Sequence, residues 1–270
     1  MHSDRLNLLK AWFESYTGTF LTGETIADSP LTLKIDHSAR VCQNMRRLGR
    51  SINLTQDRIS LAQAIGLFHD LGRFAQYRRY RTFNDSQSVN HAVLSIDALK
   101  KTGVLDELPA EEKTIITDAI RFHNAPALPN NKPPPCMIFM RLIRDADKLD
   151  IWKVFADVYR HHRHPESAIV QHLPDRPGWS DEIVKAVREN RMARLQDMRT
   201  LNDFKLLQLS WVFDLNFPET MRQARKRGDL AAIAETLPDD RELQDAMAGV
   251  MERLDNCIGS TKRFDDPINQ

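Results

Sequence analysis

The 270-residue sequence lacks several features that would indicate its class directly. It has only three cysteines, an odd number that lie far apart, which favours reduced thiols in a cytoplasmic protein over a disulfide framework. Its 38 lysines and arginines against 37 aspartates and glutamates leave a net charge of +1, so overall charge indicates neither a nucleic-acid nor a membrane partner. No apolar run reaches about 18 residues, and no apolar leader occurs near Met1, so we expect a cytoplasmic chain without a membrane span.

Alternating strand patterns and internal repeats are also absent. Instead, apolar residues recur at a spacing of three to four, which indicates amphipathic helices. The predicted helices are residues 5–22, 36–49, 55–70, 88–103, 110–123 and 136–159, then 180–199, 202–215, 219–235 and 239–257. The sequence therefore predicts an all-α, multi-helix bundle. We expect a catalytic domain over residues 1–160, with its core at 34–155, and a helical C-terminal extension over 161–270 packed on the same domain.

The stretch Leu67-Phe-His-Asp-Leu-Gly-Arg73 carries the clearest chemical signal. Adjacent histidine and aspartate side chains point about 100° apart on a helix, so they can meet one ion only near a helix end. Gly72 is interpreted as the stop of this helix, and the arginine-rich segment 77–86 as a loop that could cover the site. The motif thus predicts a metal centre that other elements complete.

Candidates for the remaining ligands lie on both sides of this motif. His37 shares the apolar side of its helix, His91 falls in a first helical turn, and His123 falls at a helix end. Imidazole and carboxylate suit divalent ions such as Mn, Fe, Co, Ni or Zn, and the absence of cysteine argues against a structural zinc site. Asp145 and Asp147 lie about 200° apart around one helix, so periodicity does not choose between them.

The order of these residues resembles the HD-domain metal-dependent phosphohydrolases. In that family the last ligand is commonly the aspartate of an Ala-Asp-Lys-Leu string, which here implies Asp147, with Asp145 as a rival. His91 and His123 resemble second-metal ligands of the two-metal branch, which includes the HD-GYP phosphodiesterases. Asn124-Ala-Pro, however, replaces the second histidine and Gly-Tyr-Pro of that subgroup. The implied ligands of one or two divalent ions are His37, His69, Asp70, His91, His123 and Asp147.

The resemblance implies a phosphohydrolase that cleaves a phosphate ester or anhydride with a metal-bound hydroxide as the nucleophile, and a nucleotide is the expected substrate. A di-iron HD-domain oxygenase and a non-catalytic ligand-sensing module are the alternatives. Asp70, Arg73 and Lys148 are the expected catalytic residues, although Lys148 is equally interpreted as a surface lysine. The expected substrate-binding residues are Arg73, Arg78, Arg79 and Arg81. We interpret His161, His162, His164 and His172 as solvated surface; the oligomeric state is not predicted.

Overall fold

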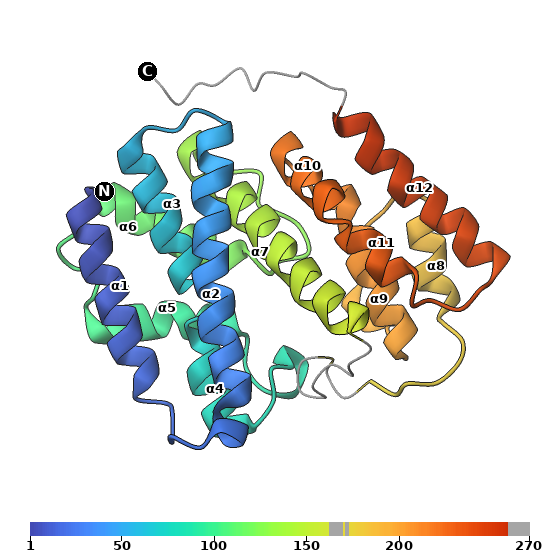
Figure 1. Ribbon diagram of the computed structural model, residues 1–270. Coiled ribbons are helices and arrows are strands. Elements are labelled where there is room, and N and C mark those ends of the chain that lie inside the picture. The colour runs from blue at the N-terminus through green and yellow to red at the C-terminus, as the bar shows by residue number, and fades with distance from the viewer. Residues whose placement is uncertain (162–169, 171–172, 259–270) are drawn as a thin grey trace. The chain divides into compact units, whose positions relative to one another are not determined.

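The computed structural model describes residues 1–161, 170 and 173–258, with side chains described up to residue 256. Within these residues the structure consists of helices α1 to α12 and three short 3-10 segments, and it contains no strand (Figure 1). The all-α prediction is therefore confirmed. No helix of the described part combines the length and the apolar character needed to cross a bilayer.

The chain divides into two compact units, whose main segments are Met1–Asp147 and Lys148–Arg263. The division falls inside α7, Pro134–Arg160, which is one continuous helix. The boundary expected after residue 160 coincides with the end of this helix. The predicted division into a catalytic domain and an extension stays a prediction.

The first unit contains the helices of the predicted metal centre. Helix α2 packs closely on α3, α1 also packs on α3, and α4 packs on α5. Gly66 permits the first of these contacts, since a Cβ there would lie 3.0 Å from backbone atoms of Cys42. The helices of this unit are α1 Ser3–Gly18, α2 Thr25–Ser51, α3 Gln56–Phe68, α4 Gly72–Tyr80, α5 His91–Thr102 and α6 Ala110–Phe122, followed by the first part of α7.

Several helix ends follow from local chemistry. The Thr55 side chain accepts from the backbone N–H of Arg58, which confirms this residue as the N-cap of α3. Asn90, rather than Ser88, caps α5 by accepting from Ala92. Gly103 ends α5 in the left-handed conformation, as its sequence position predicts.

The interpretation of Gly72 as a helix stop is wrong. Helix α3 already ends at Phe68, and Gly72 is the first residue of α4. Glycine is needed because a Cβ at this position would lie 2.2 Å from the carbonyl oxygen of His91. The N–H of Gly72 also donates to Ser95 Oγ at 2.7 Å. The role of Gly72 is therefore to allow the close approach of α4 to α5, and not to end a helix.

Two further helix predictions in this unit need correction. The expected loop at 77–86 is helical up to Tyr80, because packing on α5 overrides a segment without an apolar period. Helix α2 begins at Thr25 and contains Pro30, whereas the prediction started at residue 36. Pro30 is the sixth residue of this helix, so it removes one hydrogen bond, to the Ile26 carbonyl, and the helix nevertheless continues through it. This added part of α2 carries Lys34.

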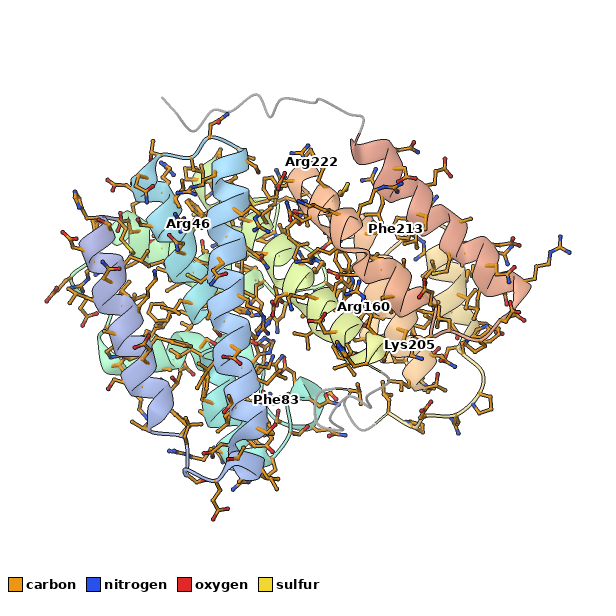
Figure 2. The ribbon with its side chains drawn as sticks, in the orientation of Figure 1. Arg46, Phe83, Arg160, Lys205, Phe213 and Arg222 are labelled. Carbon is orange, nitrogen blue, oxygen red and sulfur yellow. The ribbon has the colours of Figure 1, made fainter. Side chains whose placement is uncertain are left out.

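The second unit is built around one buried helix. Its helices after α7 are α8 Asp181–Arg188, α9 Leu201–Ser210, α10 Pro218–Arg227, α11 Asp229–Ala234 and α12 Arg241–Ile258. Every residue of α9 is buried, and Lys205, labelled in Figure 2, donates to the Thr236 carbonyl at 2.9 Å. The helix predicted at 180–199 ends at Arg188, and the one predicted at 219–235 is divided by Gly228, which is left-handed.

Candidate metal centre

Helix ends and one continuous helix deliver the predicted ligands to one place in the first unit. His69 and His123 are the C-caps of α3 and α6, and His91 is the first residue of α5. His37 lies inside α2, and Asp147 lies on α7. Three overlapping groups of potential ligand atoms result, and together they contain His37, His69, Asp70, His91, His123 and Asp147. The structure thus brings together the whole predicted ligand set.

The four histidines form two pairs with facing ring nitrogens. The Nε2 atoms of His37 and His69 lie 3.2 Å apart, and those of His91 and His123 lie 3.0 Å apart. Two nitrogens bound to one ion at about 2.1 Å are separated by about 3.0 to 3.4 Å at angles between about 90° and 109°. Each pair therefore has the spacing of two ligands that share one ion.

The other ring nitrogen of three histidines shows which tautomer is present. His69 Nδ1 lies 2.9 Å from the Gly66 carbonyl, and His123 Nδ1 lies 2.7 Å from the Ile120 carbonyl. His91 Nδ1 lies 2.7 Å from Asp85 Oδ2. Carbonyl and carboxylate oxygens only accept, so Nδ1 carries a proton in each ring, and in a neutral ring Nε2 then presents a lone pair.

The pair of His91 and His123 consequently places two lone pairs opposite each other. Burial lowers the pKa of His123 to about 3, and burial also lowers the pKa of His91, so neither ring is readily protonated near neutrality. Facing lone pairs repel each other unless a cation lies between them. The donor chemistry of this pair fits a divalent metal ion.

Asp70 connects the two histidine pairs through its two oxygens. Oδ2 lies 3.7 Å from His37 Nε2 and 3.8 Å from His69 Nε2. Oδ1 lies 3.3 Å from His91 Nε2 and 4.0 Å from His123 Nε2. Burial alone would raise the pKa of Asp70, but the nearby Lys34, His69 and Arg73 hold it well below its usual range. The residue is thus an ionised carboxylate with the geometry of a bridge.

Asp147 rather than Asp145 reaches the centre. Its Oδ1 lies 3.1 Å from His37 Nε2 and 3.6 Å from His69 Nε2. Although burial raises the pKa of Asp147, hydrogen bonds to the two histidines hold it well below the usual range. No group of potential ligands among the described residues includes Asp145 or Asp150, which are both buried.

Sequence reasoning missed two charged residues beside the ligands. Asp85, in the 3-10 segment Asp85–Gln87, accepts from His91 and also from Arg73 at 3.0 Å, Gln76 at 2.9 Å and Asn124 at 3.2 Å. Burial raises its pKa, but these donors lower it to about 2. Lys34 donates to Asp70 Oδ2 at 2.8 Å. Neither residue has a local motif, because each acts through a partner distant in the chain.

The predicted substrate-binding arginines have other partners in the structure. Arg73 donates to Gln76, Asp85 and the Phe83 carbonyl, and its Nε lies 3.4 Å from Asp70 Oδ1. The exposed Arg78, Arg79 and Arg81 lie over the rings of Phe20, Tyr80 and Tyr77. Their role toward a substrate stays a prediction.

Two other sets of predicted residues belong to none of the ligand groups or lie outside the described residues. Lys148 pairs with Asp214 at 2.6 Å, and its catalytic role stays a prediction. His161 is exposed, and its Nδ1 lies 2.6 Å from the Asp157 carbonyl. His162, His164 and His172 lie outside the described residues.

A comparison with protein families agrees with this geometry. Residues 35–152 match the family model of the HD domain. This part of the chain is an HD domain. All predicted ligands fall inside the matched range, and the HD domain is a helical fold found mostly in metal-dependent hydrolases. The comparisons with curated proteins and with solved structures found no match.

Proposed function

We propose that this HD domain is a phosphohydrolase that uses two divalent ions to cleave a phosphate ester or anhydride of a nucleotide. The observation that carries the proposal is the 3.0 Å approach of the Nε2 atoms of His91 and His123, which Asp70 joins to a second pair of histidines. A single-ion site would not require the Asp70 carboxylate to face both pairs.

Each residue has a defined part in this reaction. His37, His69 and Asp147 would hold one ion, His91 and His123 would hold the other, and Asp70 would contribute one oxygen to each. Divalent ions in such pairs polarise a phosphoryl oxygen and lower the pKa of water near neutrality. The Nδ1 hydrogen bonds to Gly66, Asp85 and Ile120 fix the ring orientations, so the ligands require little rearrangement to bind.

Metal analysis combined with a phosphate-release screen tests this function. The protein, prepared anaerobically, should bind about two ions of Mn, Fe, Co, Ni or Zn per chain and release phosphate from at least one nucleotide. Asp97, exposed on α5, offers a control, because Asp97→Asn should change neither quantity. Two bound irons with oxygen consumption and no phosphate release would favour the oxygenase instead. A metal-free protein without turnover would favour the ligand-sensing module.

A further inference from the structure

Lys34 is a second cation beside the bridging carboxylate. It precedes His37 by three residues on α2, so the two side chains lie on the same side of the helix. Its Nζ lies 2.8 Å from Asp70 Oδ2, and its side chain keeps 16% of its surface exposed. The lysine therefore lies, like Asp147, at a partly exposed edge of a largely buried ligand cluster.

Arg73 and Lys34 occupy opposite oxygens of Asp70 but differ in their other contacts. Nη1 of Arg73 donates to Gln76, Phe83 and Asp85, so the guanidinium is tied to the segment that carries Asp85. Lys34 donates to a single oxygen among the described residues, whereas an ammonium group has three N–H donors. Two donors of Lys34 are thus available beside the centre.

The position of this ammonium group is also defined. The Phe83 ring lies beneath it, with 5.4 Å between Nζ and the ring centroid (Figure 2 labels Phe83). A cation over an aromatic face is attracted by the ring, and this contact restricts the lysine without using its N–H groups. The ammonium group of Lys34 is therefore held in position while two of its N–H donors stay available.

We propose that Lys34 is the residue that contacts the phosphoryl oxygens of the substrate. The inference rests on the proposed function, and it assigns Arg73 to positioning Asp70 and Asp85. A lysine binds phosphate as a point charge, and a phosphoryl group at this centre lies next to the carboxylate that Lys34 already reaches. The chemical class of the ligand is therefore a terminal phosphoryl group, with inorganic phosphate as its simplest form.

Binding of inorganic phosphate to the manganese-loaded protein, measured by calorimetry, tests the assignment without depending on turnover. Lys34→Met keeps the chain length and removes the charge. We expect it to retain about two manganese ions and to bind phosphate at least about 10-fold more weakly. Lys34→Arg should recover part of the affinity. Arg46→Met is the matched control, because Arg46 is exposed on the same helix, about 18 Å farther along its axis (Figure 2).

Each outcome bears on the proposal. If Lys34→Met kept its full metal content and bound phosphate as tightly as the parent, the proposal would be overturned. Loss of metal in this variant would also overturn it, because Lys34 would then serve to hold Asp70. If the parent hydrolyses no nucleotide but its phosphate affinity depends on Lys34, the contact stands and the proposed function fails. If the parent hydrolyses a nucleotide and Lys34→Met has the same kcat/KM and phosphate affinity, the function stands and the contact fails.

Discussion

The two halves of the proposed metal centre use carboxylates in different ways. In the half formed by His37 and His69, the second carboxylate, Asp147, faces the ring nitrogens directly. In the half formed by His91 and His123, the second carboxylate, Asp85, lies behind the ring and accepts from His91 Nδ1. The first half thus has one more negative ligand, whereas the second depends on the orientation of its rings. We therefore expect the first half to bind its ion more tightly.

Loss of the residue that both halves share should have the largest effect. Asp70→Ala removes an oxygen from each half, so we expect both ions to be lost and phosphate release to fall by roughly 10³-fold or more, about 4 kcal/mol. Metal analysis and turnover measure these effects. The helical circular dichroism should be retained, because Asp70 lies in the turn between α3 and α4 and not in the apolar core. Full activity in this variant would contradict the assignment of the centre.

Removal of the two histidines of the second half should abolish the binding of one ion and leave the binding of the other intact. The double variant His91→Ala, His123→Ala should bind about one ion per chain instead of about two, because His37, His69 and Asp147 are unchanged. Metal content after dialysis checks this number. A content of about one ion in the parent protein would show that the second half is not a metal site.

Asp85→Asn should lower the metal affinity of the second half and leave that of the first half unchanged. The amide accepts a weaker hydrogen bond from His91, so we expect the affinity of one of the two ions to fall by about 10- to 100-fold. Titration of the metal-free protein with manganese measures both affinities. Asp97→Asn, on the exposed side of α5, should leave both unchanged. Equal weakening of the two ions in Asp85→Asn would contradict the separate roles of the halves.

Arg73→Ala should give the smallest effect. Asp85 keeps its contacts with His91, Gln76 and Asn124, so we expect less than about a 10-fold loss of metal affinity and about a 10-fold loss of kcat/KM. Arg46→Ala, exposed on α2, is the control and should match the parent. If Arg73→Ala lowered the metal affinity as much as Asp85→Asn does, Arg73 and not Asp85 would be the main residue that orients His91.

Much of the fold was predicted from local chemistry. The apolar stripes of α5 and α6 reveal these helices, because one buried face recurs at the helical period, whereas α3 is buried on every side from Ile59 to Phe68. Helix α4 was missed because its sequence has no such stripe and its packing on α5 depends on Gly72. The prediction for α2 began at residue 36 and missed the first part of the helix, residues 25–35, which contains Pro30.

The sequence by itself predicted the candidate ligands and their order, because histidines and aspartates at such positions are local features of the chain. Only the tertiary structure decided between Asp145 and Asp147, since they lie on different sides of one helix and periodicity favours neither. It also decided that Asp70 faces both histidine pairs, and that Lys34 and Asp85 support the centre. These contacts join residues from different helices, so they exist only after those helices pack together.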